Sequence, residues 1–235
     1  MSAPETLPAG DVATPLKPMQ QMTIANLRRG REGTVPVTIT AEARAEGLLA
    51  ARERFPLPDG GRATVTVLLA RVLARTLADH PALHATLTDE ALIHHADVGL
   101  GVAVAAEDGS LAVPVVPRAQ ALEVPELAAA LADLSARARA RKLRVEQVRG
   151  GSFTLSSTGM VRLPILGTPL LPPGHTGILL AACAAERPVV QDGALAAGLV
   201  MPLSLTFDHA AVNGIPAVRF LHDLVGRIEQ PDAWL

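Results

Sequence analysis

The chain has one cysteine, Cys183, among its 235 residues, so no disulfide can form within it. It therefore fits a reducing compartment, and the cytoplasm is the expected location. The N-terminal sequence MSAPETLPAG lacks the basic start and the apolar run of a secretory signal peptide. A formal net charge of -2 gives no broad electrostatic attraction to nucleic acid or to an anionic membrane, so neither partner is expected.

Long uninterrupted apolar stretches are also missing. The most apolar long segment, residues 163–185, contains four prolines and three glycines. A membrane-spanning helix of about 20 residues would not accommodate them without compensation, so we expect a soluble protein. Hydrophobic residues still make up 49% of the chain and charged residues 19%, which is typical of a globular domain.

Hydrophobic patterning predicts helices and strands in mixed order. Residues 1–18 are rich in proline, alanine and threonine and predict a flexible tail, whereas residues 19–235 predict one folded domain. Helices are expected over 19–29, 43–54, 63–79, 124–141 and 215–228, and strands over 35–41, 84–87, 91–95, 98–105, 111–116, 152–156, 177–184 and 198–207. A turn at Glu107, Asp108 and Gly109 is expected to form a hairpin. The predicted fold is an α+β two-layer sandwich, in which helices cover one face of a mixed sheet.

His209 is the main candidate for a catalytic residue. It follows an apolar strand and precedes Asn213 and Gly214, which open the last helix. A histidine at the end of a rigid strand can project into a cleft, and imidazole exchanges protons near neutral pH. The pattern therefore predicts a general base, with an exposed histidine at the start of a loop as the alternative.

Four segments together resemble a known family. DHAAVNG followed by AVRFLHDL is similar to the end of the catalytic core of dihydrolipoyl acyltransferases of 2-oxo acid dehydrogenase complexes. Three other segments resemble parts of that family and occur in the same order. They are MQQMTIANLRRG with VPVTITAEARAEGLLAAR, GLGVAVAAEDGSLAVPVV with the helix after it, and GGSFTLSSTGM with PPGHTGILLAACAAERPVV. The resemblance runs from residue 18 to the C-terminus and implies the fold that this family shares with chloramphenicol acetyltransferase.

The resemblance also implies an enzymatic activity, that of a coenzyme A-dependent acyltransferase. His209 falls on the family's catalytic base, which removes a proton from the thiol of coenzyme A or of dihydrolipoamide. Ser156 falls on the serine that donates a hydrogen bond to the developing oxyanion, with Ser157 as the fallback. The residues that bind coenzyme A are not identified. Two alternatives are a noncatalytic scaffold subunit and an O- or N-acetyltransferase of small molecules.

Two positions near His209 depart from the family pattern. Asn213 stands where the family has an aspartate, and Ala210 stands where it has an arginine. In the family the aspartate pairs with an arginine that corresponds here to Arg29, or to its neighbour at position 28. Asparagine can accept the same hydrogen bond without a charge, so we expect a weaker contact and an impaired enzyme. Asp208 and Gly214 belong to the same motif and are expected to support the site.

The expected partners also come from the resemblance. It implies a homotrimer with the active site between subunits, and a hydrophobic C-terminal segment that links trimers into a larger cage. Trp234 either forms such a contact or packs on its own domain. The two lysines, Lys17 and Lys142, do not stand in the sequence context of a lipoylated lysine. We therefore expect no lipoyl-lysine in this chain, and an acyl group supplied as acyl-CoA or by a lipoyl domain or other carrier on another chain.

Three other features are given structural interpretations. The four histidines between residues 80 and 95 are not surrounded by carboxylates, so no metal site is expected there. Cys183 lies in an apolar stretch and is expected to be buried in a strand. The arginine run ARARARKLR is expected to be a solvated helix face, with a contact to a coenzyme A phosphate as the alternative.

Overall fold

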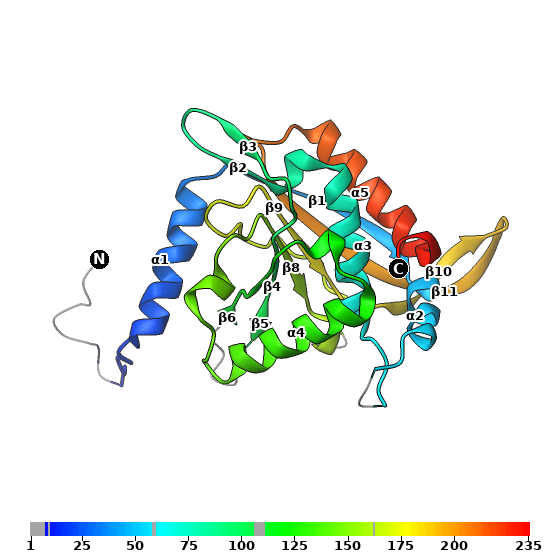
Figure 1. Cartoon of the computed structure of the whole chain (residues 1–235), viewed down its shortest axis with the longest axis horizontal. Coiled ribbons are helices and arrows are strands. Elements are labelled where there is room, and N and C mark those ends of the chain that lie inside the picture. The colour runs from blue at the N-terminus through cyan, green and yellow to red at the C-terminus, as the bar shows by residue number, and fades with distance from the viewer. Residues whose placement is uncertain (1–7, 9, 58–59, 106–110, 162) are drawn as a thin grey trace.

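A mixed seven-stranded sheet forms the centre of the computed structural model, which describes residues 8, 10–57, 60–105, 111–161 and 163–235 (Figure 1). Its strand order is β1-β11-β9-β8-β4-β7, with β10 paired to the outer part of β11. The strands are β1 (Pro36–Arg44), β4 (Leu100–Val102), β7 (Val115–Val116), β8 (Phe153–Ser157), β9 (Gly177–Ala181), β10 (Ala185–Gln191) and β11 (Ala194–Asp208). β8 runs parallel to β4 and β9, and the other pairs are antiparallel.

Two short ribbons and five helices complete the fold of the described residues. The ribbons are β2 (Ala85–Leu87) with β3 (Leu92–His94), and β5 (Val104–Ala105) with β6 (Leu111–Ala112). The helices are α1 (Pro18–Glu32), α2 (Glu46–Ala51), α3 (Val65–Asp79), α4 (Val124–Arg139) and α5 (Gly214–Glu229), with 3-10 turns η1 (Arg52–Arg54), η2 (Pro81–His84), η3 (Ala119–Ala121), η4 (Val145–Val148), η5 (Gly159–Val161) and η6 (Pro231–Ala233). Helices α3, α4 and α5 lie on one face of the sheet, which confirms the predicted α+β class (Figure 1).

The core lies between those three helices and the sheet. α3 begins where the Thr64 hydroxyl accepts a hydrogen bond from the backbone of Val67 (3.2 Å), and ten of its 15 residues are buried. Within it, the buried guanidinium of Arg71 donates to the carbonyl of Leu122 (2.7 Å) and to the Glu123 carboxylate (2.8 Å). These bonds connect α3 to the start of α4, so the helical layer is held together by charge as well as by apolar contact.

Helix α1 stands apart from this layer and touches the rest of the chain mainly through its last turn. The α-carbon of Gly30 lies against the backbone carbonyl of Leu171, so close that a β-carbon would overlap the carbonyl oxygen. The Thr34 hydroxyl then donates to the carbonyl of Gly30 (2.7 Å). The end of α1 is therefore attached to the loop of residues 163–175, which precedes β9.

Two expectations about secondary structure differ from the structure, and a third cannot be compared with it. The helix expected over 43–54 starts later, because Ala43 and Arg44 extend β1 by pairing with Met201 and Val200 of β11. β10 was not predicted, because Pro188 weakens the strand pattern of this edge strand. The expected turn at residues 107–109 lies outside the described residues, although its flanking strands β5 and β6 do pair. Residues 10–17 form no helix or strand, and the boundary predicted at residue 18 stays a prediction.

The C-terminus packs on its own domain. The Trp234 ring lies over the guanidinium of Arg227, with 3.7 Å from the guanidinium carbon to the ring centroid, and Leu235 contacts the core. This arrangement is the second of the two alternatives for Trp234. In the described ranges, no helix combines the length and the apolar character needed to cross a membrane.

Candidate active site

His209 lies where β11, the longest strand, gives way to the last helix. Its backbone N–H donates to the carbonyl oxygen of Val35 (2.8 Å). The buried Asp208 carboxylate accepts from the backbone N–H groups of Val35 (2.9 Å) and Ala210 (3.1 Å). The main chain is thus fixed on both sides of His209, whereas the imidazole is exposed beside the Phe207 ring. This geometry leaves the imidazole free to meet a ligand from outside the chain.

Asn213 and Gly214 begin α5, as the sequence predicts. Asn213 is the N-cap residue, and its carbonyl oxygen accepts from the backbone of Ala217 (3.3 Å). Within the described part of the chain its side chain has no hydrogen-bond partner, and Arg29 donates instead to Asn26 of its own helix. Gly214 has open space where a β-carbon would lie. The pairing of Arg29 with Asn213 is not formed in the single chain and stays a prediction.

Ser156 lies on the sheet face opposite the helices. Leu155 points into the core, and alternation along β8 places Ser156 on the other side. Its hydroxyl has no hydrogen-bond partner among the residues that the structure describes, so it is available to a ligand. In the same row across the sheet stand Leu180 of β9 and Ser204 of β11. The Ser204 hydroxyl accepts from the backbone of Gly167 (3.3 Å), so the 163–175 loop covers this face.

The structure does not bring Ser156 and His209 together in one chain. Ser156 is in register with Ser204, two strands across the sheet, and His209 lies five residues farther along β11. Strand spacing and rise per residue then give roughly 20 Å between the two α-carbons. A bound thioester cannot contact both side chains within a single subunit.

A cavity of about 560 Å³ opens beside the ends of β8 and β9, near the start of α3. Sequence reasoning did not find it, because its lining comes from distant segments. The Ser157 hydroxyl lies 3.1 Å from that of Thr66, and both face this cavity with Arg52. The remaining lining is largely apolar and includes Leu49, Val65, Leu69, Met160, Leu199 and Met201. Such a pocket suits a long, flexible, mostly apolar ligand.

Cys183 also lines this cavity, and the expectation that it is buried in a strand is wrong. β9 ends at Ala181, and Cys183 is partly exposed beyond it. Ala182 still donates to the carbonyl of Pro202 on β11 (3.1 Å). Pro202 has no N–H to donate back to β9, so the hydrogen-bond ladder between β9 and β11 ends there.

A group of histidines lies near the start of β9. The His175 ring is partly buried, bonds through Nδ1 to the Thr154 hydroxyl (3.0 Å) and packs on Gly151. Burial lowers the pKa of His175 to about 4, and the charge of His95 contributes. Burial also lowers the pKa of His84 to about 4, with smaller contributions from His95 and from the histidine at position 94. No three His, Cys, Asp or Glu side chains in the described ranges are placed to hold a metal ion.

We expect the folded protein to lose stability as the pH falls from about 6.5 toward 4. The unfolded chain binds protons on His175 and His84 in this window, because an unperturbed histidine has a pKa of about 6.5, whereas the folded chain does not. For His175 the difference corresponds to about 3 kcal/mol at the acid end. Thermal unfolding followed by circular dichroism across this range should show His175→Gln losing less stability than the wild type. An identical pH dependence in the two proteins would assign the acid sensitivity to other groups.

Comparison with known proteins identifies the family. The profile of the 2-oxoacid dehydrogenases acyltransferase (catalytic domain) matches residues 8–235. The dihydrolipoyllysine-residue acetyltransferase component of the acetoin cleaving system of Bacillus subtilis is 32% identical over 227 residues, which cover 93% of this chain and 56% of that protein. The chain therefore spans about half the length of this curated relative.

Solved structures agree with this match. The dihydrolipoamide acetyltransferase of Azotobacter vinelandii superposes with a TM-score of 0.88 at 30% identity, covering 98% of this chain and 99% of that one. That enzyme was studied for the role of a serine, a histidine and an asparagine in its catalytic mechanism, and its asparagine follows the histidine by four positions, as Asn213 follows His209. Its serine precedes the histidine by 52 positions. In this chain Ser157 precedes His209 by the same number of positions, and Ser156 precedes it by one more.

A chloramphenicol acetyltransferase superposes with a TM-score of 0.54 at 14% identity, covering 92% of this chain and 95% of that one. This likeness concerns the fold alone, and it agrees with the architecture that the four sequence segments imply. With the profile match over residues 8–235, the chain belongs to the family of 2-oxoacid dehydrogenase acyltransferase catalytic domains.

Proposed function

We propose that this protein transfers an acyl group between the thiol of coenzyme A and the thiol of a dihydrolipoyl group on a carrier domain. The observation that carries the proposal is His209, held at the end of β11 by Val35 and Asp208 in a chain of this family. Neither of the two lysines in these 235 residues stands in the context of a lipoylated lysine, so the dihydrolipoyl group is carried outside this domain. With one cysteine, partly exposed, the protein suits the reducing cytoplasm.

The reaction follows from the chemistry of the two side chains. His209 takes the proton from the attacking thiol, and the resulting thiolate adds to the carbonyl carbon of the thioester. The Ser156 hydroxyl donates to the oxyanion of the tetrahedral intermediate. When the intermediate collapses, the carbon–sulfur bond to coenzyme A breaks, and the leaving thiolate takes the proton back from His209. One thioester is lost and one is formed, so no oxidant or reductant is needed.

The asparagine at position 213 is compatible with full activity. The Azotobacter enzyme has an asparagine at the same distance from its histidine, so Asn213 gives no reason to expect an impaired enzyme. The exposed amide can accept a hydrogen bond from an arginine such as Arg29 without carrying a charge. This spacing also weakens the case for a noncatalytic scaffold subunit, which rested partly on Asn213.

A homotrimer would complete the active site. Ser156 and His209 are roughly 20 Å apart in one chain, so a neighbouring copy must supply one of them. Val35, whose carbonyl bonds to His209, is exposed, as are Ile215 and Val218 at the start of α5, and these apolar side chains suit burial against another subunit. Trp234 packs on its own domain, and therefore offers no support for a larger cage built from trimers.

The 560 Å³ cavity is the proposed site for the pantetheine arm of coenzyme A. Its largely apolar lining suits a long flexible chain, and it reaches the end of β8, which carries Ser156 and Ser157. Arg52, at this cavity, offers a positive charge to a phosphate of the cofactor. The thioester would then lie next to Ser157, which faces this cavity, whereas Ser156 faces the opposite side of the sheet.

The direct test mixes the purified chain with acetyl-CoA and dihydrolipoamide and follows the release of coenzyme A, while light scattering measures the solution mass. We expect release of coenzyme A and the mass of a trimer. A monomer would contradict a site shared between subunits. Absence of transfer from acetyl-CoA, succinyl-CoA and a branched-chain acyl-CoA would favour the scaffold role, and transfer to a small-molecule hydroxyl or amine alone would favour the other alternative.

A further inference from the structure

The segment of residues 137–149, called here the basic segment, concentrates positive charge in a chain that is acidic overall. It carries six arginine and lysine side chains and one acid, Glu146. Its net charge of +5 leaves -7 for the rest of a chain whose total is -2. The last turn of α4, the η4 turn and the connections around them form this segment. Its charge therefore lies on one short stretch of surface.

Most of this charge is not neutralised within the chain. Arg137 pairs with Asp133 (2.7 Å), but four exposed cations of the segment form no salt bridge among the described residues: Arg139, Lys142, Arg144 and Arg149. The dipole of α4 favours positive charge in its last turn, which accounts for Arg137 and Arg139. It does not account for the cations that follow the helix, because the dipole effect is confined to the terminal turn.

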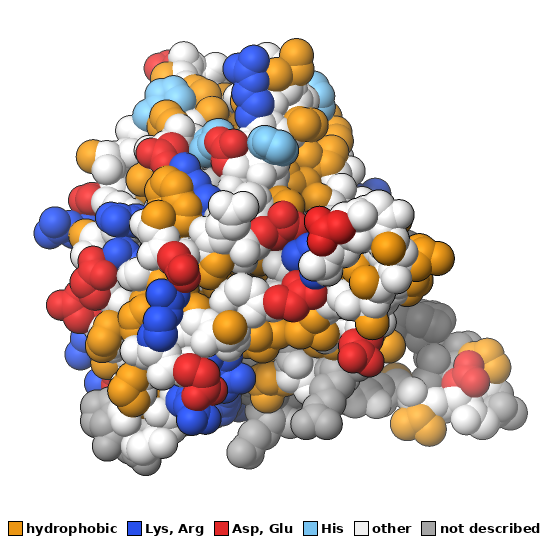
Figure 2. Space-filling view, turned by 90° about the vertical axis from the view of Figure 1, so that its right-hand side faces the viewer, with side chains coloured by type: hydrophobic (Ala, Val, Ile, Leu, Met, Phe, Trp, Pro, Cys, Tyr) orange, Lys and Arg blue, Asp and Glu red, His pale blue; other side chains and the backbone are white. Residues whose placement is uncertain are grey.

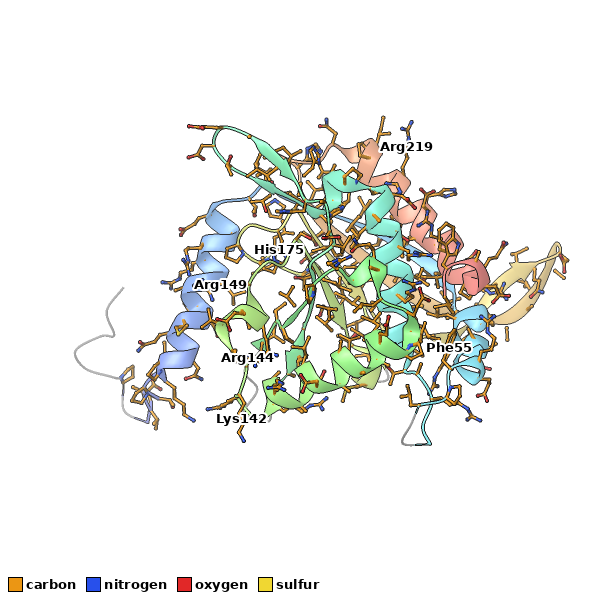
Figure 3. All side chains as sticks on the ribbon, in the orientation of Figure 1. Phe55, Lys142, Arg144, Arg149, His175 and Arg219 are labelled. Carbon is orange, nitrogen blue, oxygen red and sulfur yellow. The ribbon has the colours of Figure 1, made fainter. Side chains whose placement is uncertain are left out.

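The basic segment also exposes apolar side chains. Val145 and Val148 of η4 are 54% and 47% exposed, and they stand between Arg144 and Arg149 in the sequence. Figure 3 shows Lys142, Arg144 and Arg149 on one side of the molecule, the side on which α1 lies. On the face shown in Figure 2, by contrast, acidic and basic side chains are interspersed. Exposed apolar side chains next to charged ones are typical of a protein-binding surface.

The segment is connected to the proposed active site through the backbone. Gly150 and Gly151 follow it directly, and β8, which carries Ser156, begins two residues later. Ser152 donates to the carbonyl of Gly99 (2.9 Å), and Gly151 lies against the ring of His175. The connection between the basic segment and β8 is therefore well ordered rather than a long loop. A partner docked on the segment would be held at a fixed position relative to β8.

From these observations we propose that the basic segment is the docking surface for an acidic carrier domain that brings the dihydrolipoyl arm to the active site. The inference rests on the proposed function, which requires an acyl carrier domain. A small domain with negative charge and an apolar spot fits the unpaired cations and the two exposed valines. A nucleic acid or an anionic membrane would also face the rest of the chain, whose net charge of -7 repels it. Both partners are therefore disfavoured.

The test compares two acceptors in the same assay. One is free dihydrolipoamide, and the other is a lipoylated domain of net negative charge, reduced to the dithiol; acetyl-CoA is the donor for both. The variant Arg144→Gln with Arg149→Gln removes two charges from the basic segment. The control is Arg75→Glu, an exposed position on α3 without a salt bridge among the described residues, and it changes the net charge by the same amount.

For the lipoylated domain, we expect the double variant to lower kcat/KM about tenfold at low salt, because electrostatic steering raises association rates by a factor of this order or more. The loss should shrink as salt is added. With free dihydrolipoamide, kcat/KM should not change, and Arg75→Glu should resemble the wild type with both acceptors.

Three results would overturn the proposal. Equal kcat/KM for the wild type and the double variant with the domain would remove the docking role. A raised KM for acetyl-CoA with both acceptors would assign the segment to a cofactor phosphate, and binding of anionic vesicles in place of the domain would assign it to a membrane. If the wild type transfers nothing to free dihydrolipoamide, the proposed function itself fails, which is a separate outcome.

Discussion

Replacing His209 with alanine should lower kcat for acyl transfer by about 10²- to 10⁴-fold, the range typical of a general base. The attacking thiol would then have to lose its proton to water, and the neutral thiol is the weaker nucleophile. The imidazole is exposed, and the turn is held by backbone bonds to Val35 and by the Asp208 carboxylate. The fold and the assembly should therefore survive the substitution. Release of coenzyme A from acetyl-CoA in the presence of dihydrolipoamide measures the effect.

His222→Ala is the matched control. This histidine is exposed on α5, far along the helix from the strand end that carries His209. It should keep wild-type kcat, and circular dichroism and solution mass should be the same for both variants. Wild-type turnover in His209→Ala would reject the assigned base while leaving the family and the fold untouched.

Mixing two inactive variants should restore activity. If each active site takes His209 from one subunit and Ser156 from its neighbour, a trimer of mixed subunits contains some sites with both groups intact. Random mixing of equal amounts of His209→Ala and Ser156→Ala subunits leaves about one quarter of the sites complete, because each of the two positions is intact in half of the subunits. The activity of each parent variant alone should be lower than that of the wild type by about 10²-fold or more, so recovery of a quarter of the sites is a large increase.

The mixing experiment requires the subunits to be exchanged by co-expression or by refolding together, with differently tagged copies to purify mixed trimers. Simple mixing of preformed trimers is the control, and it should give only the sum of the two residual activities. If co-assembled trimers are no more active than that sum, the site does not combine His209 and Ser156 from different chains. Repeating the experiment with Ser157→Ala in place of Ser156→Ala shows which serine donates to the oxyanion.

Much of the fold was predictable because its long elements carry strong local patterns. α3, α4 and α5 were predicted nearly to their ends, since their apolar side chains recur at the helical period and Pro81 or a cap ends the run. The start of α2 was not, because Ala43 and Arg44 favour a helix locally but are held in β1 by pairing with β11. Long-range pairing of this kind leaves no signal in the segment itself.

The candidate site was predictable in part for the same reason. His209, Asn213 and Gly214 form one short motif, so their positions follow from the sequence, and the structure adds how Asp208 fixes the main chain around them. The cavity beside Ser157 was not foreseen, because α2, α3, β9 and β11 each contribute part of its lining. Cys183 was misjudged because the end of its strand depends on Pro202, which lies on another strand.

The close approach of Gly30 to the carbonyl of Leu171 has a consequence for how the protein can vary. The β-carbon of any other residue at position 30 must displace either α1, the helix that holds Arg29, or the 163–175 loop, which covers the sheet face opposite the helices. A single substitution would thus disturb at least one of these two parts of the site. Mutational scanning should find this glycine nearly invariant, whereas the outward-facing Met22 and Leu27 of the same helix tolerate replacement unless a neighbouring subunit covers them.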